Sequence, residues 1–88
     1  MLTLSLEVLN ELGLHARVAS RVVREAKKFH SSVLVQKEGK TYDLKSVLGV
    51  MTVGAKYGDI LSVEFNGDDE EAASEAIREL FLDKFGEK

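Results

Sequence analysis

The chain has 88 residues, a formal net charge of −3 at pH 7, and neither cysteine nor proline. This length predicts one domain over residues 1–88, the lack of cysteine excludes disulfides and thiol chemistry, and the negative charge disfavours a nucleic-acid binder. Because the first residues are not basic and no uncharged stretch approaches the roughly 20 residues of a membrane span, we expect a cytoplasmic protein that inserts in no membrane.

The first third of the chain has a strand pattern followed by a helix pattern. Residues 2–8 alternate apolar and polar side chains, which predicts a strand with one buried face. After a turn at 10–13, apolar residues at 16–29 recur three and four positions apart. This spacing predicts an amphipathic helix whose basic residues lie opposite its buried stripe.

The middle of the chain predicts a hairpin and a short helix. Two short strands, 32–37 and 40–44, flank a two-residue turn whose glycine allows a positive φ. The apolar segment 47–53 predicts one short helix, and Gly54 is expected to end it.

The last part of the chain predicts a strand and a longer helix. Residues 59–66 alternate again, and a glycine turn follows them. Asp68 with Glu71 three positions later resembles a capping box, so the last helix is expected to start there. Its buried stripe is predicted to consist of six residues: Ala72, Ala73, Ala76, Ile77, Leu80 and Phe81.

The predicted element order is βαββαβα. A hairpin in the middle and short alternating strands indicate a mostly antiparallel four-stranded sheet. Because such strands bury one face only, all helices are expected on that face. The fold class is therefore α+β, an open-faced two-layer sandwich.

His15 and Arg17 are the first candidate site residues. His15 is expected at or beside the first position of the helix that follows it, where free N–H groups and the helix dipole favour anions. Neutral imidazole is a nucleophile, and the guanidinium of Arg17 suits a phosphate. The same spacing is also typical of a partly exposed loop histidine and an arginine that solvates a helix, and the residues alone favour this plainer interpretation.

Charge and a second motif leave similar alternatives. Five of the six charged residues between positions 17 and 28 are basic, which indicates either a solvated helix face or a surface for an acidic partner. Ser46 is a natural N-cap of the short helix, the plainest role for it. The helix after Ser46 has more apolar residues than the core needs from so short an element, so some are expected to form an exposed apolar patch. A phosphate on Ser46 would place negative charge beside that patch.

Two motifs at fixed separation make the chain resemble the HPr family, the histidine-containing phosphocarriers of the bacterial phosphoenolpyruvate-dependent sugar phosphotransferase system. The resemblance covers essentially the whole chain. It is carried by the sequences Gly13-Leu14-His15-Ala16-Arg17 and Lys45-Ser46-Val47-Leu48-Gly49-Val50-Met51, the turn at Gly39-Lys40 and the segment Gly67 to Glu71.

The resemblance implies a role for each motif. His15 is implied to accept a phosphoryl group on Nδ1 from Enzyme I, which draws on phosphoenolpyruvate, and to pass it to IIA components of sugar transporters. Arg17 would stabilise that phosphate. Ser46 would be the regulatory serine of an HPr kinase/phosphorylase, whose product acts with a carbon-catabolite transcription regulator.

The resemblance also implies a partner-binding surface and a protein that works without a metal or cofactor. The surface residues would be Ala16, Ser20, Val47, Leu48, Gly49 and Met51. We expect a monomer that needs no metal and no cofactor and that does not turn over alone as an enzyme. Val18 stands where the family usually has proline, which restores an N–H in the first helical turn and gives up a fixed φ.

Two other functions stay open within the same family. One is a regulatory binding module that acts through Ser46 and partner docking. The other is the nitrogen-related branch, which keeps the histidine for regulation. His15 favours a carrier over a pure regulator, and the Ser46 segment favours the sugar branch.

Overall fold

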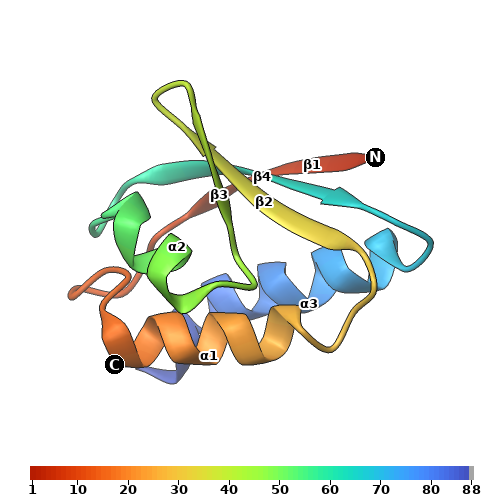
Figure 1. The fold of residues 1–88 in the computed structure, drawn as a ribbon. Helices are drawn as coiled ribbons and strands as arrows, with labels where there is room; N and C mark the ends of the chain where they lie inside the picture. Colours follow the sequence, from red (N-terminus) through yellow and green to blue (C-terminus); the bar gives the residue numbers. More distant parts are fainter. Residues whose placement is uncertain (88) are drawn as a thin grey trace.

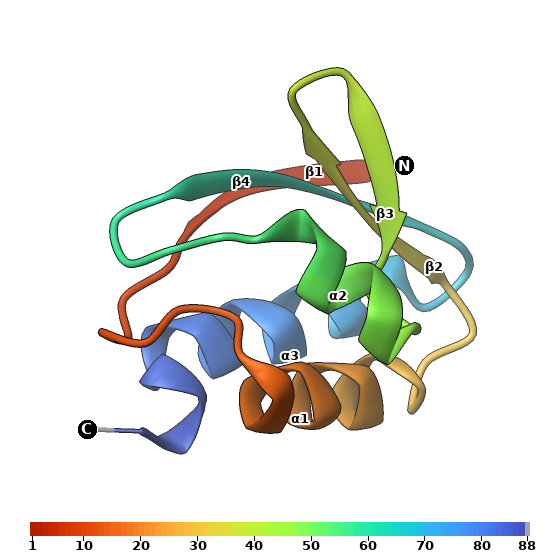
Figure 2. The same ribbon diagram turned by 60° about the vertical axis from the view of Figure 1, so that its left-hand side comes forward.

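A computed structural model describes residues 1–87 as a four-stranded antiparallel sheet with three α-helices on one of its faces (Figures 1 and 2). This confirms the predicted fold class. The elements are β1 (Leu2–Glu7), α1 (Ala16–Ala26), β2 (Ser32–Lys37), β3 (Lys40–Asp43), α2 (Val47–Val53), β4 (Ile60–Asn66), α3 (Glu70–Leu82) and a 3-10 turn η1 (Lys84–Gly86).

The sheet has the order β1-β4-β2-β3, and its buried face follows from the strand register. In the central strand β4, Val63 pairs with Leu4 on one side and with Val35 on the other, so all three side chains lie on one face. Val63 and Phe65 are fully buried, whereas Ile60 is 68% exposed. The predicted alternation is therefore confirmed, and the face without helices is open.

The helices cover the other face, and most residues of their predicted buried stripes are confirmed. In α1 the buried residues are Val18, Ala19, Val22, Val23 and Ala26. In α3, the predicted residues Ala73, Ile77, Leu80 and Phe81 are buried and Ala76 is half-buried, but Ala72 is exposed and Ser74 is buried instead. Within residues 1–87 no helix is long and apolar enough to cross a membrane.

Two boundaries show how local geometry ends an element. α1 ends at Ala26, three residues before the predicted end, because the N–H groups of Lys28 and Phe29 bond three positions back rather than four, each at 3.2 Å. The hairpin between β2 and β3 has Glu38 at φ 51° and Gly39 at φ 79°. Both residues are left-handed, as in a type I′ turn.

The predicted capping box of the last helix is wrong. α3 starts at Glu70 with Asp69 as its N-cap, and the Asp69 side chain caps no N–H of its own helix. Its carboxylate instead accepts the backbone N–H groups of His30 (2.8 Å) and Ser31 (2.9 Å) and the Ser31 hydroxyl. A competing partner 38 residues away thus replaces the local bond, and Glu70 accepts the Gly67 N–H at 3.2 Å.

The Asp69 contacts make stability depend on acid pH. The Ser31 hydroxyl and then the His30 N–H lower the pKa of Asp69 from 3.8 to about 2. The stabilisation is therefore complete above the unfolded pKa and is lost as the pH falls toward about 2. An Asp69→Asn variant should unfold at a lower temperature than the wild type at about pH 6, and the gap should shrink near pH 2. Asp68→Asn, a change at an exposed neighbour, should show no such pH-dependent gap in the same thermal melts.

The end of the described chain turns back toward the start of α1, as both ribbon views show (Figures 1 and 2). The turn needs two consecutive non-glycine residues in the left-handed region, Lys84 at φ 55° and Phe85 at φ 56°. Phe85 is buried and packs edge-on against Phe81 with ring centres 4.8 Å apart. This packing holds the turn, which the sequence patterns did not predict.

Candidate functional site

The loop before α1 is held against the segment that follows α2. Gly13 has φ 70°, and a Cβ at this position would lie 2.5 Å from the carbonyl oxygen of Ala55. The next residue, Leu14, donates its N–H to that same oxygen at 3.1 Å. Only glycine allows this close approach in this backbone conformation. The loop therefore delivers His15 to a defined position.

His15 is the N-cap residue of α1, as predicted, but its side chain caps nothing. Its backbone is extended (φ −81°, ψ 179°), and its carbonyl accepts the Ala19 N–H at 2.8 Å. The ring makes no hydrogen bond to the first-turn N–H groups, so these donors have no partner within the helix. The His15 side chain is 27% exposed. It is therefore accessible at a helix end that favours anions.

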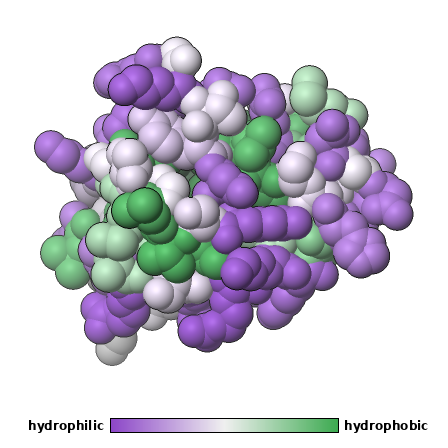
Figure 3. All heavy atoms as spheres, viewed as in Figure 1, coloured by the Kyte–Doolittle hydropathy of each residue, from purple (hydrophilic) through white to green (hydrophobic). Residues whose placement is uncertain are grey.

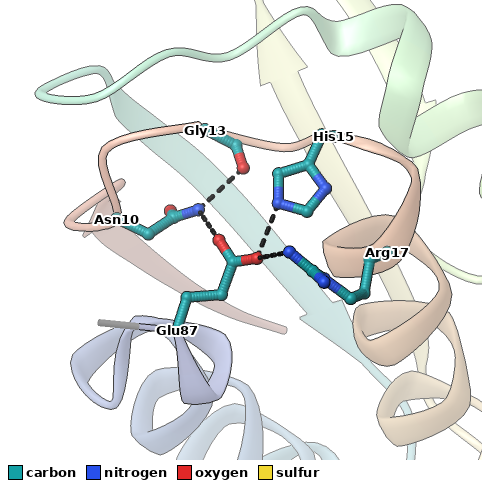
Figure 4. Close-up of polar contacts among 5 residues, drawn as sticks. All are labelled: Asn10, Gly13, His15, Arg17 and Glu87. Atoms are coloured by element: carbon teal, nitrogen blue, oxygen red, sulfur yellow. Dashed lines mark hydrogen bonds and ion pairs between the residues drawn. The ribbon is translucent and has the colours of Figure 1, made fainter.

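One carboxylate joins the two predicted site residues. Glu87 Oε2 lies 2.7 Å from Nε2 of His15 and 3.0 Å from Nη2 of Arg17 (Figure 4). The Glu87 side chain is only 16% exposed, whereas that of Arg17 is 78% exposed. The structure thus brings His15 and Arg17 together around a single anionic group.

Asn10 fixes the other oxygen of the same carboxylate. Its buried side-chain Nδ2 donates to the Gly13 carbonyl at 2.8 Å and to Glu87 Oε1 at 3.0 Å (Figure 4). Both partners are acceptors, so the amide cannot be turned the other way. Asn10 Oδ1 is buried without a hydrogen-bond partner in the described part of the chain. This unsatisfied acceptor is the cost of aiming the amide at Glu87.

The surroundings keep Glu87 ionised. The hydrogen bond from Asn10 is the largest cause that lowers its pKa; burial opposes the shift, and hydrogen bonds from His15 and Arg17 add to it. An ionised carboxylate only accepts hydrogen bonds. Nε2 of His15 is therefore the donor in this contact, so in the neutral ring the proton is on Nε2.

The basic face of α1 continues beyond the site. A surface hollow of about 650 Å³ lies beside it, and its lining includes Arg17, Arg21 and Arg24 together with Glu87. The lining also includes Glu11, so this hollow combines three arginines with two acidic residues.

The second motif forms an N-cap and an apolar surface. Ser46 Oγ accepts the Gly49 N–H at 3.1 Å, which confirms the predicted capping role. Beyond it, Val47 is 39% exposed, Leu48 76% and Met51 44%. These three residues form what we call the α2 patch, seen as apolar surface over α2 (Figure 3). The excess of apolar residues predicted for this helix is therefore exposed.

The remaining predicted surface residues have different surroundings. Ala16 and Ser20 are exposed in α1, one turn apart. Gly49 is half-buried, and a Cβ there would lie 2.7 Å from the Asp43 carbonyl oxygen, so this glycine has a packing role. His30 is at the far end of α1 and has ligand atoms within 4.8 Å of those of Asp68 and Asp69. That exposed cluster carries no site, because Asp69 already accepts three hydrogen bonds.

Two residues of the site escaped sequence reasoning, Asn10 and Glu87. Asn10 was assigned only to a turn, and its buried amide gives no pattern in the sequence. Glu87 lies 72 positions from His15. No local signal joins residues so far apart, because the turn at Phe85 that brings Glu87 back depends on packing against α3.

The arrangement suits the transfer of an anionic group to a ring nitrogen. With the proton on Nε2, the lone pair of His15 is on Nδ1, on the side of the ring away from Glu87 (Figure 4). Arg17 and the first-turn N–H groups of α1 lie at the same end of the helix as His15 and can donate to an anion there.

Comparisons with known proteins show similarity to the HPr family of phosphocarriers along the chain. A family model described as "PTS HPr component phosphorylation site" matches residues 2–83. The phosphocarrier protein HPr of Xylella fastidiosa is 39% identical over 87 residues, which cover 99% of this chain and 98% of that protein. The crystal structure of HPr from Thermoanaerobacter tengcongensis has a TM-score of 0.94 at 40% identity and covers 100% of this chain and 99% of that one.

Another similar solved structure is that of a catabolite-repression protein. It is Crh, the catabolite-repression protein of Bacillus subtilis, described as a dimer with a swapped domain. Crh is 32% identical, with a TM-score of 0.76 and coverage of 96% of this chain and 97% of its own. The chain is thus similar along its length both to phosphocarriers and to a regulator.

Proposed function

Because the chain belongs to the HPr family of phosphocarrier proteins, we propose that His15 accepts a phosphoryl group from Enzyme I, with phosphoenolpyruvate as the source. We propose further that His15 passes this group to IIA components of sugar transporters. The observation that carries the proposal is the convergence of His15 and Arg17 on one carboxylate, at 2.7 Å and 3.0 Å. This convergence places the guanidinium of Arg17, a group that also suits a phosphoryl group, beside the His15 ring.

In the proposed transfer, the Nδ1 lone pair of His15 attacks the phosphorus of the phosphorylated donor. A nitrogen–phosphorus bond forms, and the bond between phosphorus and the donor atom breaks with its electron pair staying on the donor. The proton on Nε2 stays in place, so the ring becomes formally cationic. Onward transfer to a IIA component is the same step in reverse. Arg17 and the first-turn N–H groups, including that of Val18, offset the phosphoryl charge.

The direct test is to incubate the protein with Enzyme I and phosphoenolpyruvate. We expect an acid-labile adduct on Nδ1 of His15, identified by phosphorus and nitrogen NMR, which disappears when a IIA component is added. Omission of Enzyme I is the control and should give no adduct. An acid-stable adduct, or one on another side chain, would rule out the carrier function.

We also propose that Ser46 is a regulatory phosphorylation site for an HPr kinase/phosphorylase. Its hydroxyl already lies at the N-terminus of α2, where a phosphate is tolerated by the helix dipole. A phosphate there adds charge beside the α2 patch, which we propose as a docking surface for Enzyme I and other partners. Binding of the phosphorylated form to a carbon-catabolite transcription regulator belongs to the same proposal.

A Ser46→Asp variant should accept the phosphoryl group from Enzyme I about tenfold more slowly, because charge beside an apolar docking surface disfavours the encounter. Rapid-quench measurement of adduct formation checks this. Ser5→Asp is the matched control, because Ser5 is exposed on β1 and lies outside both motifs. Equal rates for the two variants would remove Ser46 from the regulation of transfer.

The similarity to Crh favours a second candidate, a regulatory module that acts through Ser46 and docking. A regulator of this kind has no need for a nucleophile, whereas this chain has His15 with Arg17 beside it. Phosphorylation of Ser46 by kinase and ATP without any phosphorylation of His15 by Enzyme I would favour the regulator.

A further inference from the structure

Glu87 is the residue of the site for which the proposed transfer gives no role. Its carboxylate contacts three side chains that come from the loop before α1 and from the first turn of α1. A single oxygen, Oε2, contacts both His15 and Arg17 (Figure 4). We infer that Glu87 is a positioning residue for phosphoryl transfer: it holds the His15 ring with its proton on Nε2 and its lone pair on Nδ1, and it anchors Arg17 beside that ring.

The first support is the chemistry of the contact. Nε2–H donates to an ionised carboxylate at 2.7 Å, so in the neutral ring Nδ1 is the unprotonated nitrogen. When Nδ1 forms its bond to phosphorus, the ring gains positive charge while the Nε2 proton remains. The carboxylate then faces a cation, which strengthens the hydrogen bond at the moment of transfer. A carboxylate serves the imidazole of serine hydrolases in the same way.

The second support is that the contact is built into the fold. Lys84 and Phe85 hold left-handed conformations that are unfavourable for residues with a Cβ. Burial of Phe85 against Phe81 offsets this strain and brings Glu87 to the site. Asn10 then fixes the carboxylate at the cost of leaving its own Oδ1 unsatisfied. The strained turn and the unsatisfied Asn10 oxygen both serve to place one carboxylate, and local strain of this kind is typical of a functional contact.

The third support is that Glu87 does not consume the donors that a phosphoryl group needs. Arg17 gives only Nη2 to Glu87 (3.0 Å), and its side chain is 78% exposed. The rest of its planar fork stays available for an anion. The carboxylate and the phosphoryl group also lie at opposite nitrogens of the ring. Glu87 therefore orients the His15 ring and the Arg17 guanidinium without occupying the position of the phosphoryl group.

The kinetic test uses Glu87→Gln, which keeps the shape and removes the charge. This inference depends on the proposed function, so the wild type is phosphorylated in parallel by Enzyme I and phosphoenolpyruvate. We expect the variant to be about tenfold slower both in acceptance and in onward transfer, because a charge-assisted hydrogen bond becomes a neutral one. Glu75→Gln makes the same change at an exposed residue of α3 and should leave both rates unchanged.

The spectroscopic test needs no phosphorylation. Nitrogen NMR of the His15 ring at about pH 8.5, above the ordinary histidine pKa of about 6.5, should show a protonated Nε2 whose proton exchanges slowly with water. In Glu87→Ala the acceptor is lost, and the Nε2 proton signal should disappear by fast exchange. A purely structural role for Glu87 would lower the melting temperature without changing this signal.

The outcomes separate the two proposals. Normal phosphorylation of the wild type with an equal or higher rate in Glu87→Gln overturns the positioning role and leaves the carrier function intact. No phosphorylation of the wild type overturns the carrier function, and the role of Glu87 in transfer with it. Slower transfer in Glu87→Gln, with an unchanged melting temperature and loss of the Nε2 proton signal in Glu87→Ala, supports the positioning role. If Glu87→Ala does not fold, the kinetics and NMR spectrum of Glu87→Gln decide the question.

Discussion

A His15→Ala variant should form no detectable phosphoryl adduct with Enzyme I and phosphoenolpyruvate. The expected loss is complete because a methyl group offers no lone pair and the described site contains no second nucleophile. The fold should survive, since the His15 side chain is 27% exposed and its hydrogen bond is to the Glu87 carboxylate. Radiolabel transfer measures the adduct, and circular dichroism with a thermal melt checks the fold.

His30→Ala is the matched control for this experiment. His30 is the other histidine of the chain and lies at the opposite end of α1, beside Asp68 and Asp69. Those carboxylates repel a phosphoryl group, so removal of His30 should leave acceptance unchanged. Label that persists in His15→Ala, or that is lost in His30→Ala, would show that His15 is not the phosphoryl acceptor.

A Gly13→Ala variant should be destabilised by about 2–5 kcal/mol and should also accept the phosphoryl group poorly. The left-handed backbone costs an alanine about 1–2 kcal/mol. The Cβ would also lie 2.5 Å from the Ala55 carbonyl oxygen, and such overpacking costs about 1–3 kcal/mol more. Relief of this clash moves the loop that positions His15. Urea unfolding measures the stability, and rapid-quench kinetics measures acceptance.

Gly39→Ala separates the clash from the backbone conformation. Gly39 has a similar φ of 79°, but no atom lies within 4 Å of a Cβ at that position. This variant should therefore lose only the conformational part, about 1–2 kcal/mol, and should accept phosphoryl groups at the wild-type rate. Equal destabilisation of the two variants would show that the contact with Ala55 is not what requires glycine at Gly13.

Together these contacts describe a site that is assembled from both ends of the chain. The loop before α1 supplies His15, the first turn of α1 supplies Arg17, and the turn after α3 supplies Glu87. Asn10 ties the last of these to the first. A change in any of the three segments is therefore expected to alter the geometry at the imidazole.

The elements of this fold were predictable where short-range physics decides them. Alternation in β4 follows from one buried face of the sheet, and Val63 and Phe65 lie on that face. Ser46 was predicted as an N-cap and Gly54 as the end of α2, because caps depend on residues that are only a few positions apart.

The misassigned start of α3 shows where local rules fail. Asp68 and Glu71 fit a capping box, yet Asp69 is the N-cap and its carboxylate binds the backbone at His30 and Ser31. The local bond and the long-range bonds compete for nearby acidic groups. Only the position of the preceding loop decides between them.

By itself, the sequence determined the element order, most of the buried stripes, and the placement of His15 and Arg17 at the start of a helix. Each of these depends on periodicity or on spacings of a few residues. The tertiary structure alone decided that Glu87 and Asn10 join them, and thereby which nitrogen of the imidazole carries the proton. The position of Glu87 depends on the packing of Phe85 against Phe81, which holds a strained turn. Such burial joins residues through the tertiary structure, so no local sequence pattern indicates it.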